Sequence, residues 1–203
     1  RAIFILGPSS SGKTTLCNAL AQDLLDEDED QGVYIREVAR RVMSTQGFTR
    51  NDTGTYEMQR AIMHAQAQAE IDVVLRLRNA QGPPPPGNAL RDRLLLLSDR
   101  SAVDPVVYAS TGAEVAEREG IRSRLVNDRT FQAVLPLYRR SVFVVLHPVE
   151  EWLTDDGVRS LEDPWVYLQE LFRTLQELGI PFVEVETGVR DLRERVALVK
   201  RCM

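Results

Sequence analysis

The sequence predicts an α/β domain in which helices cover both faces of a five-stranded parallel sheet. Short apolar runs alternate along the chain with stretches whose apolar residues recur at helical spacing, a pattern typical of parallel βαβ units. The first of these runs leads directly into a glycine-rich loop. The chain has 203 residues, 43% of them hydrophobic, which suits a single domain over residues 1–203.

Five apolar runs have the length of a strand and end at glycine, proline or polar residues. The run of leucines before Ser98 predicts a central strand buried on both faces, followed by the polar turn Ser98-Asp99-Arg100. The five predicted strands are Ala2–Leu6, Val33–Glu37, Leu94–Leu97, Val142–Leu146 and Phe182–Val185.

Helical periodicity follows several of these runs. Lys13–Leu25 and Thr55–Asn79 each carry apolar residues along one face. Asp163 and Pro164 predict the start of another helix, because the carboxylate can cap it and proline suits its first turn, and Gly179 predicts its end. The residues that line the last predicted helix are Val189, Leu192, Val196 and Val199.

Composition excludes several classes of protein. The formal net charge is -5, so we expect no nucleic-acid partner. No apolar run approaches the roughly 18 residues of a membrane span, and the first run is too short for a signal peptide. Cys17 and Cys202 form neither a disulfide framework nor a metal-ligand pattern, which favours a reducing, cytoplasmic location. Cys17 is interpreted as a small core residue.

The glycine-rich loop matches the phosphate-binding pattern G-x-x-x-x-G-K-[ST] at every fixed position. Such a loop turns its backbone N–H groups inward, and the helix that follows adds its positive end. Lys13 would contact the β- and γ-phosphates of ATP, and the Thr14 hydroxyl would bind Mg²⁺. The nucleotide-binding candidates are Gly7, Ser9, Ser10, Ser11, Gly12, Lys13, Thr14 and Thr15.

Two carboxylates follow predicted strands at the sheet edge where open α/β proteins bind ligands. Asp99 is a candidate Mg²⁺ residue with Thr14, and a simple turn residue is the alternative. Glu37 is a candidate base for the proton of an attacking hydroxyl. Its alternative is a carboxylate that stabilises a helix start.

Arginines occur near these acids. Arg100 and Arg40 are candidate contacts to an anionic group of the acceptor, with structural or surface ion pairs as the alternatives. Arg159 lies in a polar segment at about residues 148–163, interpreted as a short lid or a plain exposed loop. In a lid, Arg159 would reach the transferring phosphoryl group.

The combined pattern resembles the AAA-type P-loop kinase-like domains of the NadR-like group, which includes ribosylnicotinamide kinase and is related to nucleoside and nucleotide kinases. The matching segments are ILGPSSSGKTTL, REVAR, SDRSAVDPVVYA and DDGVRS, together with a helix carrying Gln66, Gln68 and Glu70 and the helix containing Arg193–Arg195. The resemblance implies a three-layer P-loop NTPase sandwich, with ATP and Mg²⁺ as cofactors. SDRSAVDPVVYA is also similar to a segment of thymidylate and deoxynucleoside kinases, which implies that Asp99, Arg100, Asp104 and Tyr108 lie at the acceptor site.

The leading hypothesis is therefore ATP-dependent phosphoryl transfer to a small hydroxyl acceptor. Lys13, Glu37, Asp99 and Arg159 are its candidate catalytic residues. The alternative hypothesis is a nucleotide-dependent regulatory or binding module without small-molecule kinase activity. The sequence identifies neither the acceptor nor the oligomeric state, and it does not distinguish ATP from GTP.

Overall fold

The structure is a computed structural model that describes residues 1–25, 33–80, 96–152 and 163–203. Short 3-10 turns at Arg50–Asp52 and Glu150–Trp152 supplement its regular elements. These elements, in chain order, are β1 (Ala2–Leu6), α1 (Lys13–Leu24), β2 (Val33–Ile35), α2 (Ala39–Gln46), α3 (Tyr56–Ala80), β3 (Leu96–Asp99), α4 (Val103–Gly112), α5 (Arg118–Val126), α6 (Arg129–Tyr138), β4 (Val142–Leu146), α7 (Pro164–Glu177), β5 (Phe182–Val185) and α8 (Leu192–Arg201).

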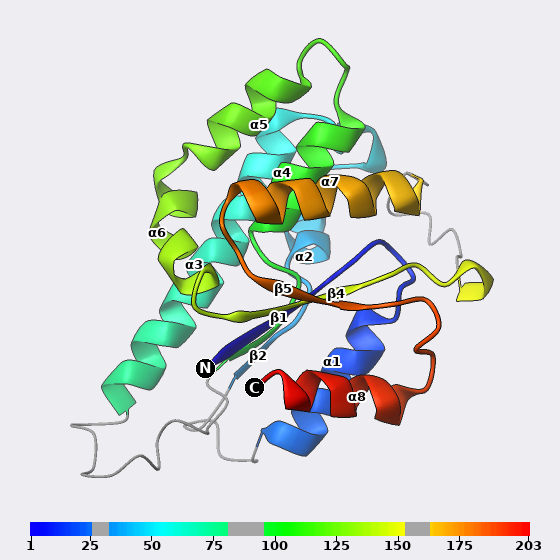
Figure 1. Cartoon of the computed structure of the whole chain (residues 1–203). Coiled ribbons are helices and arrows are strands. Elements are labelled where there is room, and N and C mark those ends of the chain that lie inside the picture. The colour runs from blue at the N-terminus through cyan, green and yellow to red at the C-terminus, as the bar shows by residue number, and fades with distance from the viewer. Residues whose placement is uncertain (26–32, 81–95, 153–162) are drawn as a thin grey trace.

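The sheet has five parallel strands in the order β2-β3-β1-β4-β5 (Figure 1). The predicted parallel sheet is therefore confirmed. Strand β1 is central, with β3 on one side and β4 on the other. After β1 the chain builds β2 and β3 on one side of it, and β4 and β5 on the other side. In open α/β sheets such a reversal of strand order creates a crevice at the carboxyl ends of the strands.

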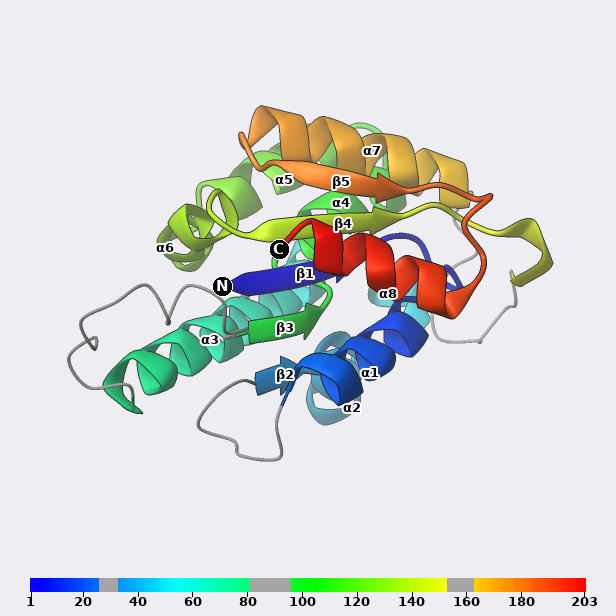
Figure 2. The same ribbon diagram turned by 60° about the horizontal axis from the view of Figure 1, so that its bottom comes forward.

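Two apolar layers cover the sheet. Alternate residues of β1 point to opposite faces, so Phe4 and Leu6 join the larger layer with helices α2 to α7. Ile3 and Ile5 join the smaller layer with α1 and α8 (Figure 2). The predicted burial of Cys17 is confirmed, because it lies in the smaller layer with no exposed surface, where burial raises the pKa of its thiol.

Strands β1, β4 and β5 have the predicted bounds. The predicted end of β3 at Leu97 is wrong, because the strand continues to Asp99. The predicted residues Leu94 and Leu95 lie outside the described residues. Pairing with β1 explains the difference, since Ile5 lies opposite Asp99 in the ladder. Strand β2 ends at Ile35, so Glu37 lies just beyond it.

Helix α7 has the predicted ends. The Asp163 side chain accepts a hydrogen bond of 2.9 Å from the Trp165 N–H, and Gly179 has a φ of 65°. The sequence analysis assigned no helix at α2, α4, α5 or α6, which are short and pack onto α3 or onto one another. None of the helices in the described ranges has the length and hydropathy to span a bilayer.

Candidate active site

The phosphate loop joins β1 to α1, as its motif predicts. Gly7 has a φ of 144°, and a β-carbon there would lie 2.5 Å from the Leu146 carbonyl oxygen at the end of β4. Gly12 has a φ of 87° directly before the first residue of α1. Both glycines therefore allow backbone conformations that a side chain would strain. Ser10 adopts a positive φ of 59° without being glycine.

Lys13 is buried and folds back over the loop. Its Nζ donates to the Pro8 carbonyl and to Ser11 Oγ, the latter at 3.4 Å. The loop forms one wall of a cleft with an empty volume of about 580 Å³, part of it open solvent. Gly7 and Ser11 shape the loop without lining this cleft. The lining residues are Ser9, Ser10, Gly12, Lys13, Thr14, Thr15, Glu37, Arg40, Asp99 and Arg100.

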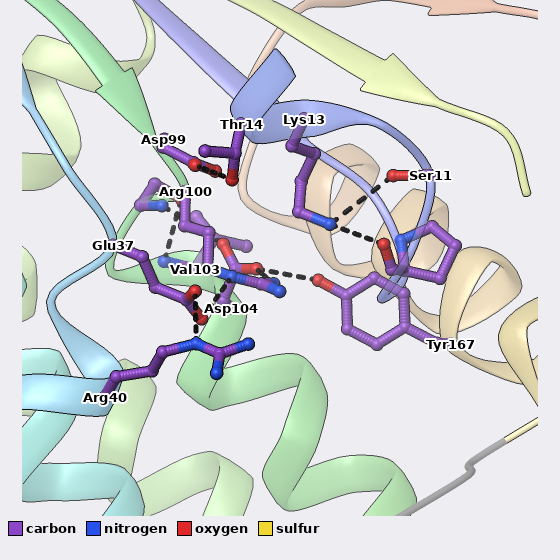
Figure 3. Close-up of polar contacts among 12 residues, drawn as sticks. Ser11, Lys13, Thr14, Glu37, Arg40, Asp99, Arg100, Val103, Asp104 and Tyr167 are labelled. Carbon is purple, nitrogen blue, oxygen red and sulfur yellow. Dashed lines mark hydrogen bonds and ion pairs between the residues drawn. The ribbon is translucent and has the colours of Figure 1, made fainter. Parts of the chain in front are cut away.

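Thr14 and Asp99 meet at the mouth of the loop (Figure 3). Thr14 Oγ1 donates to Asp99 Oδ2 at 2.6 Å, although 85 positions separate the two residues in the chain. A hydroxyl and a carboxylate are hard oxygen ligands of the kind that Mg²⁺ binds. Mg²⁺ usually keeps several waters and takes few protein ligands beside substrate phosphates, so this pair fits the ion.

A chain of ion pairs runs from Arg40 to Asp104 below the loop (Figure 3). Arg40 Nε lies 3.2 Å from Glu37 Oε2, and Glu37 Oε1 lies 3.2 Å from Arg100 Nε. Arg100 Nη1 donates to Asp104 Oδ1 at 2.7 Å, and the Tyr167 hydroxyl donates to the same oxygen at 2.8 Å. Arg100 thus contacts both carboxylates at once, through two different nitrogens of its guanidinium.

Arg100 stays charged although it is buried. Burial opposes its charge, but Tyr108, Glu37 and Asp104 together raise the pKa of the guanidinium above its ordinary value. Its backbone has a φ of 82°, which is uncommon for a residue with a side chain. Such strain persists only where the surrounding structure enforces it, and it often marks functional sites.

A second, mainly apolar pocket lies on the other side of Arg100. Its cavity volume is about 20 Å³, within about 430 Å³ of empty space that includes open solvent. Arg100 lines both this pocket and the phosphate cleft. The other lining residues come from α2, α3, α4 and the segments just before α3 and α4. They are Ala39, Met43, Thr53, Met58, Gln59, Ile62, Gln66, Ser101, Asp104, Pro105 and Tyr108.

A buried network that the sequence analysis did not assign supports the Asp99-Arg100 segment from behind. Glu70 is fully buried and accepts hydrogen bonds from the Tyr138 hydroxyl at 2.5 Å and from Gln66 Nε2 at 2.8 Å. Gln66 also reaches Ser98 Oγ at 3.1 Å, and the Ala102 N–H donates to the Tyr138 hydroxyl at 2.8 Å. The network therefore makes hydrogen bonds to the backbone or side chains on both sides of Arg100, at Ser98 and Ala102. In the sequence, the network could have been detected from Gln66 and Glu70, which are polar residues next to the apolar face of α3.

The other predicted residues lie in different settings. Arg159 and most of the predicted lid fall at 153–162, outside the described residues. Arg40 lines the phosphate cleft, but its side chain is 53% exposed.

Comparison with known proteins matches this architecture. A family model described as an AAA domain matches residues 2–195. No curated protein matches the chain. The NadR protein in complex with NAD and AMP-PNP has 17% identity and a TM-score of 0.64, over 99% of this chain and 48% of that chain. Deoxyadenosine kinase from M. mycoides with bound dATP has 14% identity and a TM-score of 0.53, over 100% and 98%. This chain thus spans about half the length of NadR, and at these identities the likeness shows the fold.

Proposed function

Because the chain belongs to the AAA domain family and has a P-loop kinase-like fold, we propose that it transfers a phosphoryl group from ATP to a small hydroxyl acceptor. The acceptor we propose is nucleoside- or nucleotide-like, and the reaction depends on Mg²⁺. A cytoplasmic location is part of the same proposal. The NadR structure contains AMP-PNP and NAD, and the deoxyadenosine kinase structure contains dATP, which supports this class of ligand.

The observation that carries the proposal is the position of Arg100 between two pockets. On one side lies the phosphate cleft with Lys13 and Thr14, and on the other lies an apolar pocket with a few polar groups. Small-molecule sites are commonly apolar with a few convergent polar groups. A kinase needs such a pair of adjoining sites, because the acceptor hydroxyl must lie in line with the transferred phosphoryl group.

The proposed roles of the residues follow from these positions. The loop N–H groups and Lys13 hold the phosphates, and Thr14 and Asp99 hold the metal ion. ATP supplies the phosphoryl group, and Mg²⁺ neutralises part of its charge. Glu37 lines the phosphate cleft, and in the proposed reaction its carboxylate accepts the proton of the acceptor hydroxyl.

The apolar pocket must widen to take an acceptor. Its cavity volume of about 20 Å³ holds about one water molecule. Met43 and Met58 line the pocket, and methionine side chains change shape easily. Arg100 and Asp104 are the charged residues in the described lining, and each is already paired with the other. The pocket therefore suits an acceptor whose buried part carries little net charge.

ADP release measured with ATP·Mg²⁺ and a panel of nucleosides, nucleotides and nicotinamide riboside tests the proposal. We expect ADP to form rapidly only when one of these acceptors is present. Acceptor-independent, slow hydrolysis that responds to a macromolecular partner would instead identify a regulatory module. A Lys13→Ala variant serves as the control for contaminating activity, since its weakened ATP binding should leave little ADP release at an ATP concentration near the KM of the unmodified protein.

A further inference from the structure

An arginine on α8 contacts the backbone of the phosphate loop from its outer side. Arg195 lies on α8 and is 2% exposed. Its Nη1 donates to the Ser11 carbonyl at 2.9 Å, across 184 positions of sequence, and its Nε donates to the Val189 carbonyl at 2.7 Å. The guanidinium thus connects the phosphate loop with the segment that leads from β5 into α8.

The Ser11 contact constrains a group that would face the phosphates. The peptide bond between Ser11 and Gly12 is planar and trans, so its C=O and N–H point in opposite directions. Holding the Ser11 carbonyl outward therefore holds the Gly12 N–H inward. A cation on the carbonyl oxygen also polarises the peptide, which strengthens its N–H as a donor.

Packing keeps the guanidinium in this place. A β-carbon at Gly12 would lie 3.0 Å from Arg195 Nη1 and 3.3 Å from Trp152 Cζ3. The Arg195 Cζ also lies 4.8 Å from the centroid of the Trp152 ring, where a cation–π interaction is favourable. Both side chains therefore lie against the loop backbone, and a glycine at position 12 is what permits this contact.

The charge of Arg195 lacks a counterion within the described part of the chain. Its hydrogen bonds go to backbone carbonyls, and its buried Nη2 has no partner among the described residues. Burial accordingly lowers the pKa of this guanidinium. Arg100 differs, because two carboxylates pair with it. A buried, unbalanced cation behind an anion-binding loop is stabilised when an anion occupies the loop.

We propose that Arg195 is a positioning residue of the nucleotide site, which orients the Gly12 N–H toward the polyphosphate and takes the bound polyphosphate as its counterion. The inference rests on the proposed function only in that a polyphosphate binds the loop. It requires neither phosphoryl transfer nor a particular acceptor. A purely structural role in anchoring α8 would affect folding and leave polyphosphate affinity unchanged.

Calorimetry with inorganic tripolyphosphate and with ATP·Mg²⁺ separates these roles, using Arg195→Met, Arg195→Lys and the control Arg193→Met. Arg193 lies on the same helix and is exposed. We expect Arg195→Met to bind both ligands about tenfold more weakly or worse, since hydrogen bonds to charged groups have effects of this size. Arg195→Lys keeps the charge but cannot make both carbonyl contacts, so its affinity should be intermediate. Arg193→Met should bind as the unmodified protein does.

Thermal unfolding without ligand and circular dichroism establish that each variant is folded. If Arg195→Met fails to fold, Arg195→Lys decides the question. A folded Arg195→Met or Arg195→Lys protein with unchanged affinity for both ligands would overturn the inference. If the unmodified protein binds both ligands but phosphorylates no acceptor, the proposed kinase function fails and this inference stands. If it binds neither ligand, both fail.

Discussion

The charged side chain of Lys13 is almost fully buried within the phosphate loop. It is 5% exposed, and its ammonium group contacts oxygens of the loop itself, the Pro8 carbonyl and Ser11 Oγ. These neutral acceptors are weaker partners for an ammonium group than phosphate oxygens are. We propose that Lys13 exchanges these two contacts for phosphate oxygens when a polyphosphate binds.

Replacing Lys13 by alanine is expected to weaken ATP·Mg²⁺ binding roughly a hundredfold, because a charge-assisted contact to phosphate is lost. Titration calorimetry measures the effect. Lys200→Ala is the matched control, since Lys200 is 47% exposed and pairs with Asp23 on the surface. Normal affinity and turnover in the Lys13 variant would contradict the assigned role.

Glu37 is 19% exposed and accepts hydrogen bonds from two arginines at the edge of the cleft. Glu37→Gln preserves one acceptor oxygen and removes the basic carboxylate. We expect kcat to fall by about 10²- to 10⁴-fold while KM for ATP changes little, as is typical for loss of a general base. Steady-state ADP release with a saturating acceptor measures both constants. Full turnover would show that Glu37 is not the base, and exposed Glu57→Gln provides the comparison.

At the scale of elements, α3 contributes more to the site than its amphipathic pattern indicates. Its buried face carries Gln66 and Glu70, which bond to one another at 2.8 Å and extend to β3 and α6. Burial, the main cause, raises the pKa of Glu70 from 4.5 to about 8, although hydrogen bonds from Tyr138 and Gln66 oppose the shift. The helix therefore holds a buried carboxyl group that binds its proton more tightly than an exposed glutamate does.

This raised pKa predicts how stability depends on pH. The folded protein binds the Glu70 proton more tightly than the unfolded chain does, so the contribution is fully present below about pH 4.5 and is lost as the pH rises through about 8. Across that range the effect is on the order of a few kcal/mol in the free energy of unfolding. Urea unfolding at several pH values measures it.

The Glu70→Gln variant should flatten this dependence, because glutamine does not titrate. Glu57→Gln on the same helix is exposed and should leave the dependence unchanged. An identical fall in stability with pH in the Glu70 variant would assign the effect to another group.

On the scale of the whole molecule, the sheet separates two apolar layers, with α3 and α4 on one face and α1 and α8 on the other (Figures 1 and 2). Phe4 is at the centre of the larger layer. Its ring lies 5.1 Å from that of Tyr138 and 4.7 Å from that of Phe143, measured between centroids. Tyr138 in turn supports the segment next to Arg100, so the core and the site share a residue.

Phe4→Ala is expected to lower the free energy of unfolding by about 3–5 kcal/mol, because it leaves a cavity among close-packed rings. Chemical denaturation measures the loss. Val115→Ala removes an apolar side chain that is 76% exposed and should cost little, since burial and not hydrophobicity decides the effect. A loss below about 1 kcal/mol for Phe4→Ala would mean that the core relaxes around the gap.

Local patterns in the sequence determined much of this protein. Apolar runs predicted the strands, and capping residues predicted the ends of α7, because these features depend on neighbours in the chain. The phosphate loop was also predictable, since its glycines, Lys13 and Thr14 are contiguous and each has a local physical reason. The candidate roles of Asp99, Glu37 and Arg100 followed from their places after strands, given that parallel strands end at one edge.

Contacts between distant segments were decided only by the tertiary structure. The extension of β3 to Asp99 depends on its ladder with β1, and the Arg195 contact spans 184 positions. The pairing of Glu70 with Tyr138 spans 68 positions. No local pattern specifies such partners, because a buried polar side chain is satisfied by whichever group packing brings within reach. The sequence therefore predicted the candidate residues at the loop, and only the tertiary structure decided which distant residues contact them.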